Sequence, residues 1–443
     1  MKNHKKVNII SLGCSKNLVD SEFLLKQLEY NGFEIHYDSN LNKCDIVIIN
    51  TCGFIKDAKE ESIDAILNYV QAKENGDIQK LYVMGCLSER YKNELSKEIP
   101  SVDKYFGVYQ LKEIVEELTS PYIVDIDFKR IITTPSHYAY LKISEGCDRT
   151  CAFCAIPLIK GNHKSKSIEQ LIKETEYLAS KGVKELILIA QDLTYYGYDI
   201  YKKFKIVELI NKLSNINGIE WIRLHYTYPL NFRKELISEI KQNPKVCNYI
   251  DIPVQHISDN ILKRMRRGVS NTSTLQLLDN IRTSMPNAAI RTTLLVGFPG
   301  ETKKDFEQLT NFVSDFKFDR LGVFEYSNEE DTYAYKHFKD NVSLKLKNER
   351  ANIIMEIQQS ISKQLNMQKI GNTYKTIIDR KEGEYFIGRT EYDSPEVDNE
   401  ILIKNTPNMP YGQKGLKIGN FYNIKINSAE DYDLFGEISK NKN

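Results

Sequence analysis

The stretch EGCDRTCAFC, residues 145–154, places three cysteines within ten positions: Cys147, Cys151 and Cys154. A structural zinc site uses four ligands, normally as two close pairs, and no fourth ligand follows here at finger-like spacing. Three closely spaced thiolates can instead hold three irons of a 4Fe–4S cluster and leave the fourth iron open. An open iron is useful where a small molecule must chelate it. The spacing therefore favours a cluster with a vacant coordination position.

The rest of the chain has the composition of a soluble globular protein. Its 443 residues suggest roughly three domains, with 41% hydrophobic and 27% charged residues. A formal net charge of +1 provides no global field for nucleic acid or an anionic membrane. The apolar stretch before Gly13 is too short and too polar for a signal sequence. We expect a cytoplasmic protein without membrane association, whose cysteines are metal ligands or free thiols rather than disulfides.

Residues 5–122 predict a small, doubly wound parallel sheet. The runs VNIISLG, DIVIINT and KLYVMG have the pattern of buried parallel strands, and amphipathic stretches separate them. Cys14, Cys52 and Cys86 each fall at the carboxyl end of one run. These ends share one rim of an open sheet, so we expect the three thiols to converge there. Coincidental packing of buried cysteines is the alternative, but three at equivalent positions favour a ligand site.

The alternation restarts over residues 133–363 and predicts a larger α/β domain. Six strand–helix units suggest a parallel sheet curled into a partial (β/α)6 barrel. The triplet of residues 145–154 lies in the loop after the first strand, at the carboxyl edge where such barrels perform chemistry. A long helical stretch, Ser343–Met367, follows the strands and is interpreted as a connector. The candidate strands are YAYLKIS, KELILIA, IEWIRLHY, YIDIPV, AIRTTLLVGF and RLGVFEY.

Residues 366–437 change character to short strands with glycine-containing turns, which predicts a small antiparallel β-barrel. This segment holds nine Lys and Arg residues against twelve Asp and Glu residues, a net charge of −3. A barrel that grips RNA should be basic, whereas an acidic barrel suits a basic protein partner. Alternatively the acidic residues form only a solvated face, because net charge does not show where the charges lie.

The spacing CxxxCxxC after the first strand resembles the radical S-adenosylmethionine (radical SAM) superfamily, with Phe153 as the aromatic residue before the last cysteine. The resemblance implies that S-adenosylmethionine chelates the open iron. The cluster then reduces it to methionine and a 5′-deoxyadenosyl radical. Further cofactor contacts are implied for Gln191 and Asp192 after the second strand, and for Arg223 and Arg291 in the third and fifth strands. Ordinary polar residues at strand ends are the alternative for these four.

Motifs over nearly the whole chain resemble the methylthiotransferase family. SLGCSKNLVDSE, INTCGFI and MGCLSER are similar to its N-terminal cluster domain, and GRTEYDSPEVD and EDYDLFGE are similar to its TRAM domain. The resemblance implies that Cys14, Cys52 and Cys86 hold a second 4Fe–4S cluster. It also implies replacement of an unactivated C–H by C–S–CH3. One S-adenosylmethionine methylates a sulfur on the second cluster, and another supplies the radical that removes the substrate hydrogen.

Three further motifs, CAFCAIPLIKG, IRLHYTYP and YIDIPVQHIS, resemble the RimO-type branch of this family. That branch modifies the β-carbon of an aspartate in the twelfth small-subunit ribosomal protein. The resemblance implies an electron donor, a sulfur donor and the ribosomal protein or small subunit as partners, and we expect a monomer. Lys160 and Lys166 depart from the arginines common in the family and lose bidentate geometry.

Two other functions stay open from the sequence. The nearer one is a transfer RNA adenosine methylthiotransferase on the same scaffold, and the remote one is a non-enzymatic protein that binds zinc and nucleic acid. Cys44 and Cys247 match no ligand pattern, and we interpret both as packing residues.

Overall fold

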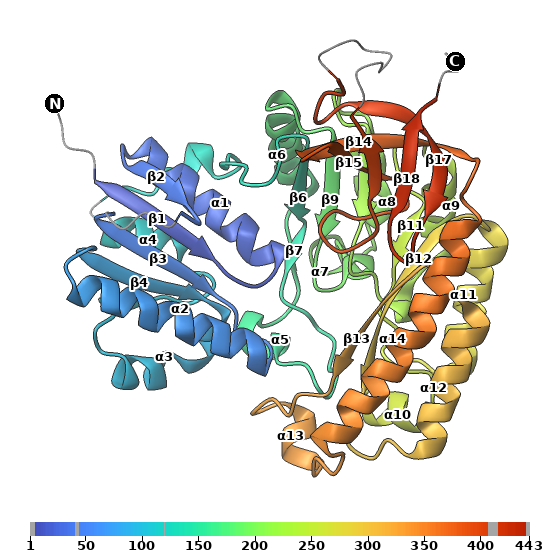
Figure 1. The fold of residues 1–443 in the computed structure, drawn as a ribbon. Coiled ribbons are helices and arrows are strands. Elements are labelled where there is room, and N and C mark those ends of the chain that lie inside the picture. Colours follow the sequence, from blue (N-terminus) through green and yellow to red (C-terminus); the bar gives the residue numbers. More distant parts are fainter. Residues whose placement is uncertain (1–4, 40–43, 119, 406–414, 440–443) are drawn as a thin grey trace.

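The computed structural model describes residues 5–39, 44–118, 120–405 and 415–439. The chain forms three successive parts: an N-terminal sheet, a central set of strands and helices, and a C-terminal barrel (Figure 1). The N-terminal sheet lies beside the first central strands, and the barrel covers one end of the central part. This is the order of parts that the sequence predicts.

The N-terminal part is a parallel sheet with helices on both faces. Its order is β2-β1-β3-β4-β5, and every neighbouring pair is parallel. Apolar residues of α1 and α4 cover one face, and those of α2 and α3 cover the other. The edge strands β2 and β5 are additional to the three predicted strands. The bounds are β1 Lys6–Ser11, α1 Ser15–Tyr30, β2 Glu34–Tyr37, β3 Ile46–Thr51, α2 Lys56–Glu74, β4 Lys80–Gly85, α3 Cys86–Glu98, β5 Lys104–Tyr105 and α4 Leu111–Glu117.

The central part contains the six predicted strands in two parallel groups, β10-β9-β6 and β11-β12-β13. Ile222 joins the groups, because its N–H donates to the Lys245 carbonyl at 2.7 Å and its carbonyl accepts from Cys247 at 2.9 Å. The strands thus run as one open series, in agreement with a partial barrel. Their bounds are β6 Tyr138–Lys142, β9 Glu185–Ile189, β10 Trp221–Leu224, β11 Tyr249–Asp251, β12 Ala289–Val296 and β13 Arg320–Glu325.

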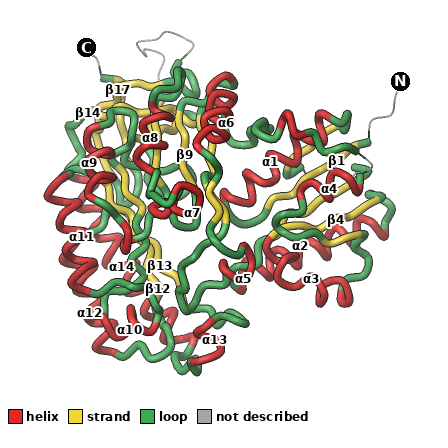
Figure 2. Tube along the Cα trace, turned by 180° about the vertical axis from the view of Figure 1, so that it is seen from behind, coloured by secondary structure: helices red, strands yellow, loops and turns green. Residues whose placement is uncertain are grey.

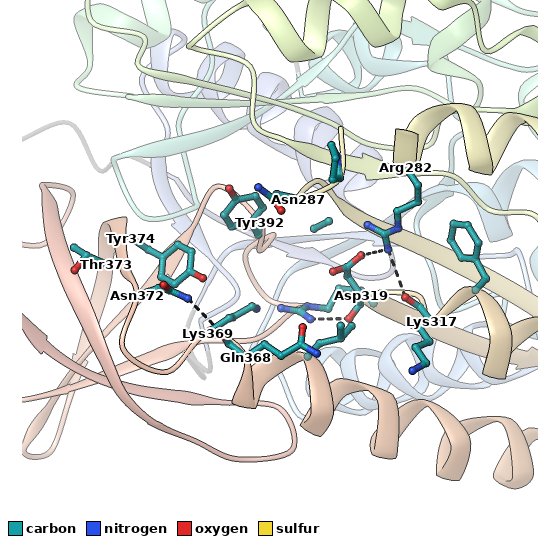
Figure 3. Close-up of a pocket in the computed structure, with 15 residues that line it drawn as sticks. Arg282, Asn287, Lys317, Asp319, Gln368, Lys369, Asn372, Thr373, Tyr374 and Tyr392 are labelled. Carbon is teal, nitrogen blue, oxygen red and sulfur yellow. Dashed lines mark hydrogen bonds and ion pairs between the residues drawn. The ribbon is translucent and has the colours of Figure 1, made fainter. Parts of the chain in front are cut away.

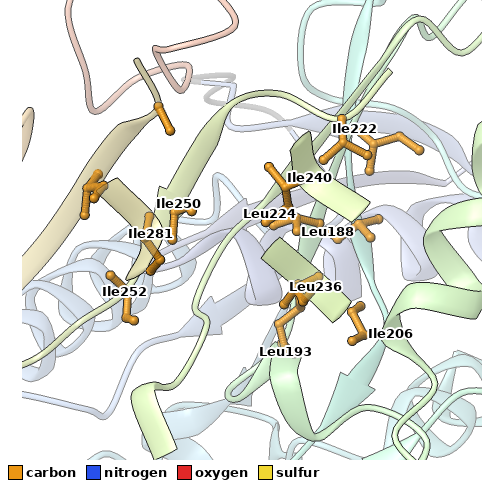
Figure 4. Packing of buried hydrophobic residues seen from close by; sticks show 14 of the residues in the cluster. Leu188, Leu193, Ile206, Ile222, Leu224, Leu236, Ile240, Ile250, Ile252 and Ile281 are labelled. Atoms are coloured by element: carbon orange, nitrogen blue, oxygen red, sulfur yellow. The ribbon is translucent and has the colours of Figure 1, made fainter. Parts of the chain in front are cut away.

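Helices cover the outer face of these strands (Figure 2). Figure 4 shows the aliphatic contact, with Leu188, Ile222 and Leu224 of the strands beside Leu236 and Ile240 of α9. Capping boxes start α6, α11 and α12, where a Ser or Thr side chain accepts from the third backbone N–H of the helix. The main helices are α6 Ile168–Ser180, α8 Ile206–Ser214, α9 Lys234–Gln242, α11 Asn271–Ser284, α12 Lys303–Phe316 and α14 Leu344–Met367.

The remaining short elements of the central part lie near the cysteine triplet and the strand ends. They are β7 Ser144–Glu145, α5 Ile156–Lys160, β8 Lys164–Ser165, α7 Tyr198–Tyr201, α10 Asp259–Arg264 and α13 Tyr333–His337, with single 3-10 turns at Leu193–Tyr195 and Pro229–Asn231. Another 3-10 turn, Val124–Ile126, lies between α4 and β6. β7 and β8 pair in antiparallel fashion and close the two ends of the triplet loop together.

The C-terminal part is a closed barrel in the order β14-β15-β16-β18-β17. Four neighbouring pairs are antiparallel, but β16 and β18 are parallel. The barrel is therefore mixed rather than purely antiparallel. The bounds are β14 Thr373–Glu382, β15 Tyr385–Thr390, β16 Ile401–Lys404, β17 Phe421–Ala429 and β18 Leu434–Ile438.

The loop between β15 and β16, residues 391–398, inserts into the central part; we call it the barrel loop. Its groups bind side chains on β6, β10, β11, β12 and β13, five of the six central strands. These partners alternate along the strands with the aliphatic residues that face the helices, so they lie on the opposite, inner face. The barrel loop thus fills the amino-terminal end of the open sheet, and the carboxyl end carries the triplet.

Candidate functional site

The N-terminal triplet lies at the carboxyl edge of the first sheet, where the sequence predicts it. Cys14 caps α1, Cys52 directly follows β3, and Cys86 begins α3. Helix amino termini favour negative charge, so the ends of α1 and α3 stabilise thiolates at these positions.

Glycines bring the three loops into direct contact. A methyl group on Gly13 would lie 2.7 Å from Cβ of Cys52, and one on Gly53 would lie 2.7 Å from Cα of Leu87, next to Cys86. Real Cβ atoms do not approach this closely, so only glycine fits beside each cysteine. The thiols of Cys14 and Cys52 also act on that of Cys86 electrostatically, which places all three within one site.

Burial opposes ionisation of two thiols of this site, those of Cys52 and Cys86. The pKa of Cys86 is raised to about 12, because burial and the neighbouring thiols of Cys14 and Cys52 outweigh the lowering effect of Lys160. Burial also raises the pKa of Cys52, while the backbone N–H groups of Phe54 and Gly53 lower it. Thiolates in such a place need a cationic partner, which iron provides.

The second triplet lies in the loop between β7 and α5. Here the N–H of Arg149 donates to Sγ of Cys147 at 3.4 Å, and Nη1 of Arg267 lies 3.3 Å from Sγ of Cys151. Burial raises the pKa of Cys147 to about 11 and that of Cys154 to about 12. The three thiols act on one another electrostatically, so the loop gathers them in one site.

The sequence did not single out Tyr228 or Arg267 as parts of this site. Tyr228 OH lies 3.5 Å from Sγ of Cys151 and donates to the Arg267 carbonyl at 2.8 Å. Its ring lies between two cations, with Arg267 at 4.3 Å and Arg149 at 4.5 Å from the centroid. Arg149 lies between Cys147 and Cys151, so its position in the sequence could have indicated a role in this site. Tyr228 lies in the IRLHYTYP motif, which resembles the RimO-type branch but does not by itself indicate a contact with the triplet.

The two triplets face each other across the boundary between the first two parts. Ala155 and Ile159, which follow Cys154, pack directly against Cys86. Lys160 lies in the same boundary, with Nζ 3.6 Å from Asp20 of α1 and 3.6 Å from Glu145 before the second triplet. The lysine ammonium is a point charge that contacts one oxygen of each carboxylate. An arginine guanidinium could instead bind both oxygens of one carboxylate.

The donor sets fit two iron–sulfur clusters. No group of three His, Cys, Asp or Glu side chains converges on a single ion within residues 5–39, 44–118, 120–405 and 415–439. A 4Fe–4S cluster does not require such convergence, because each thiolate binds a different iron. Each triplet has at least one buried cysteine, whereas Cys14 is exposed and Cys147 and Cys154 are partly buried. Helix amino termini at the first triplet and donors to sulfur at the second match what a cluster with three protein ligands needs.

Two predicted cofactor residues lie next to the second triplet. Asp192 follows β9, and its carboxylate accepts from Nε of Arg149 at 2.8 Å and from Thr194 at 2.6 Å. Gln191 precedes it and is half-buried. Phe153 is also half-buried and packs against a small apolar cluster that includes Phe298, which follows β12.

Arg223 and Arg291 lie elsewhere, at the contact with the barrel. Arg223 is fully buried, with Nε 2.8 Å from Glu185 and Nη1 donating to the Glu391 carbonyl at 2.7 Å. Arg291 lies between Asp251 and Asp398 of the barrel loop, at 3.3 and 3.5 Å. The structure therefore separates these two arginines from the residues around Asp192.

The GFPGET run, residues 297–302, forms a tight turn after β12, with positive φ at both glycines. The Glu301 carboxylate accepts from the N–H groups of Gly297 and Phe298 and lies 3.1 Å from Nη1 of Arg350. The turn is held by its own acidic residue and begins α12 through the Thr302 cap.

The acidic excess of the barrel is not a free surface. Five of its twelve acidic residues bind the central part or a residue beside it, so the net charge of −3 does not indicate the charge of a partner. The charge of the barrel therefore does not favour a protein substrate over RNA, and relatedness to known proteins indicates the substrate instead. The five residues are Asp379, Glu391, Asp393, Glu396 and Asp398.

A cavity of about 700 Å³ lies at the opposite end of the central strands (Figure 3). Its lining includes Arg282 and Asp319 near the start of β13 and Lys369 before β14. Arg282 already binds Asp319, at 2.6 Å. The cavity is thus remote from both cysteine triplets.

Cys44 and Cys247 are buried in apolar clusters, as predicted. No helix in the described part of the chain is long and apolar enough to span a membrane.

Three family descriptions match the chain in the order of its parts. "Uncharacterized protein family UPF0004" matches residues 6–107, "Radical SAM superfamily" matches residues 141–313, and "TRAM domain" matches residues 370–438. The central part therefore has a radical SAM fold, and the barrel is a TRAM domain.

Solved structures support the fold. The radical SAM methyltransferase TsrM from Kitasatospora setae, with cobalamin and a [4Fe-4S] cluster bound, aligns with a TM-score of 0.53 at 12% identity. The alignment covers 73% of this chain and 72% of TsrM. The cobalamin-dependent radical enzyme OxsB aligns with a TM-score of 0.51 at 15% identity over 80% of this chain and 56% of OxsB. Identities this low bear on the fold alone.

Full-length relatives are much more similar. The ribosomal protein uS12 methylthiotransferase RimO of Phocaeicola vulgatus is 53% identical, and the match covers 98% of this chain and 99% of the relative. The proteins of the same name from Christiangramia forsetii and Flavobacterium johnsoniae are each 54% identical over 98% of this chain, and 94% and 98% of those relatives are covered. The chain therefore belongs to the RimO family of ribosomal protein uS12 methylthiotransferases, which are radical SAM enzymes.

Proposed function

We propose that the protein adds a methylthio group to the β-carbon of an aspartate in ribosomal protein uS12, the twelfth protein of the small subunit. The observation that carries this proposal is identity of more than half of the residues to RimO proteins over 98% of the chain. The two facing sites of three thiols support it, because the reaction needs both a radical source and a sulfur carrier.

Cys147, Cys151 and Cys154 would hold one 4Fe–4S cluster, and Cys14, Cys52 and Cys86 would hold the other. When bound, the first supplies the electron that cleaves S-adenosylmethionine, and the second carries the sulfur that becomes methylated. We assign three domains to residues 5–122, 133–363 and 366–437, so that the first two domains each hold one of the two cysteine triplets.

The remaining candidate residues would bind and orient S-adenosylmethionine. Asp192 and Gln191 present acceptors beside the second triplet, where the ammonium of the methionine group would lie. Phe153 provides an apolar wall. Arg291, whose side chain is 21% exposed, is the better placed of the two candidate arginines for the carboxylate or ribose. A contact by Arg223 would require it to leave Glu185, because its side chain is fully buried.

The proposal includes the partners that the chemistry requires. An electron donor must reduce the cluster, and a sulfur donor must replace the transferred atom. The substrate is uS12, free or within the small subunit, and we place the reaction in the cytoplasm with a monomeric enzyme.

The test supplies the anaerobically reconstituted protein with reductant and S-adenosylmethionine carrying a labelled methyl group. Small ribosomal subunits and transfer RNA, both from cells without methylthiolation, are offered together. Label on uS12, lost in Cys14→Ala and Cys151→Ala, is the expected result. Label on RNA would identify the transfer RNA branch instead. Absence of both label and 5′-deoxyadenosine, with bound zinc in place of iron, would identify the non-enzymatic alternative.

A further inference from the structure

A second connection, apart from the direct contact of the two triplet loops, joins the first two parts of the molecule. It runs through the loop after β13, residues 327–332, which reaches the N-terminal part. We propose that Glu329 in this loop is a positioning residue that fixes the distance between the two cysteine triplets. This proposal rests on the proposed function.

The N-terminal end of the connection is Arg90 of α3. Its Nη1 donates to the Gly53 carbonyl at 3.1 Å, directly beside Cys52, and to Glu329 at 2.8 Å. Its Nη2 donates to the Glu330 carbonyl at 2.6 Å. One guanidinium thus links the backbone next to a cluster ligand with the loop of the central part.

Glu329 is the centre of the connection. Its side chain is 4% exposed, and its carboxylate accepts from Lys59 of α2 at 2.8 Å as well as from Arg90. Ser327 donates to the other oxygen at 2.7 Å. Burial raises the pKa of Glu329, but its hydrogen bonds with Lys59, Ser327 and Arg90 outweigh burial, so the pKa is lowered and the charged form is favoured. Two helices of the N-terminal part therefore converge on this carboxylate.

The other end of the connection reaches the second triplet after five residues. The Glu329 carbonyl accepts from Thr332 Oγ1 at 2.7 Å, and Thr332 caps α13. The N–H of Ala334 in α13 donates to the Ala152 carbonyl at 2.7 Å. Ala152 lies between Cys151 and Cys154 and is fully buried, as is Ala334. An unbroken path of bonds thus leads from Gly53 to Ala152.

This path matters because the methylthio group must pass from one site to a substrate radical generated at the other. A misplacement of about 1 Å costs such a reaction up to about 100-fold in rate. Each site alone does not need the connection. Replacement of Glu329 should therefore lower the yield of methylthiolated uS12 and leave the cleavage of S-adenosylmethionine unchanged.

The test compares Glu329→Gln with Glu330→Gln, a matched control in the next position whose carboxylate accepts from the Tyr91 hydroxyl at 3.1 Å. Hydrogen–deuterium exchange is followed in peptides that cover residues 50–56, 149–156 and 326–336. In Glu329→Gln, Arg90 and Lys59 lose their shared anion, so we expect exchange of the Ala334 amide to rise about tenfold. We expect no change in Glu330→Gln.

The second measurement is the ratio of methylthiolated uS12 to 5′-deoxyadenosine. We expect this ratio to fall about tenfold in Glu329→Gln, while 5′-deoxyadenosine formed without substrate stays at the wild-type level. Wild-type exchange together with a wild-type ratio would overturn the proposal, and so would an equal loss of both products. Arg90→Lys, a milder variant, should change both readouts in the same direction. If wild-type protein itself forms no methylthiolated uS12, the proposed function fails and the exchange result still decides the structural claim.

Discussion

Arg267 shows how much of the site depends on single residues far away in sequence. It follows Cys151 by 116 positions, yet its guanidinium donates to that thiol and to the Pro253 carbonyl at 2.6 Å. The side chain is fully enclosed, and nearby thiolates hold its pKa above the usual value against the opposing effect of burial. A fixed cation beside a cluster ligand makes the cluster easier to reduce.

We therefore predict that Arg267→Gln shifts the midpoint potential of the second-triplet cluster to a more negative value. The glutamine keeps a hydrogen-bond donor and removes the charge. Cleavage of S-adenosylmethionine should fall about 10- to 100-fold, as measured by 5′-deoxyadenosine formation, and a spectroelectrochemical titration gives the potential. Arg266→Gln, in an exposed neighbouring position, should leave both unchanged. Equal potentials in the two variants would contradict the prediction.

Gly53 provides a second prediction at this scale. Its φ is not in the left-handed region, so alanine is penalised by space alone: the added methyl would lie 2.7 Å from the backbone of Leu87. The start of α3, which carries Cys86, must then move. Gly53→Ala should destabilise the N-terminal part by about 1–3 kcal/mol and lower reconstituted iron from about eight to about four atoms per chain.

The matched control is Gly322→Ala, because a methyl group there meets no atom within 4 Å. Iron analysis and the charge-transfer absorbance of both variants give the answer. Full iron content in Gly53→Ala would show that the first triplet tolerates a displaced α3.

The segment between β11 and α10 illustrates how elements are tied together by neutral histidines. His256 is fully buried there, and its Nδ1 accepts from the Ser258 N–H at 3.0 Å. Ser258 in turn donates to Asp305 at the start of α12. Burial lowers the pKa of His256 to about 3, and the charged groups that act on it are Asp305, which raises the pKa, and Arg350, which lowers it.

A lowered pKa in the folded state means that this histidine stabilises the fold above its unfolded pKa of about 6.5. The contribution is lost as pH falls from about 6.5 toward 3, by up to about 1.4 kcal/mol per pH unit. Urea unfolding at pH 7.5, 6 and 5 should show this loss in the wild type. His256→Asn keeps an acceptor for Ser258 and should flatten the slope, with His225 still contributing because its pKa is also low. Parallel slopes for the two proteins would refute this account.

At the scale of the whole molecule, the local patterns predict more than the contacts between parts. Strand alternation predicts the first sheet and the six central strands, and cysteine spacing predicts both triplets, because each depends on neighbouring residues. The contact of Arg90 with Glu329 spans 239 positions, and no periodicity encodes such a pairing. The parallel β16–β18 pair and the acids of the barrel loop were missed for the same reason, since burial against another part decides them.

The barrel loop makes the central part and the barrel interdependent. It places Asp393 against Arg320, which is 7% exposed, and Asp398 against Arg291 and Tyr249. Ser394 bonds to His225, which is buried as well. Removal of one partner from a buried ion pair costs about 3–5 kcal/mol, and loss of the barrel would remove several partners at once. The TRAM domain is thus part of the radical SAM core rather than an appended module.

We predict accordingly that the full-length protein unfolds its core and barrel in one calorimetric transition. A chain that ends at residue 368 should be insoluble or should lose the iron of the second triplet, because the inner face of the central strands, which the barrel loop fills, is opened to water. Asp393→Asn is the subtler variant, and it should lower the unfolding temperature of the core and the barrel together. Two separate transitions in the full-length protein, or a soluble truncated chain with a full second cluster, would instead show that the core folds alone. The barrel loop would then serve only to seat the TRAM domain, and substrate binding could be separated from radical chemistry by cutting the chain.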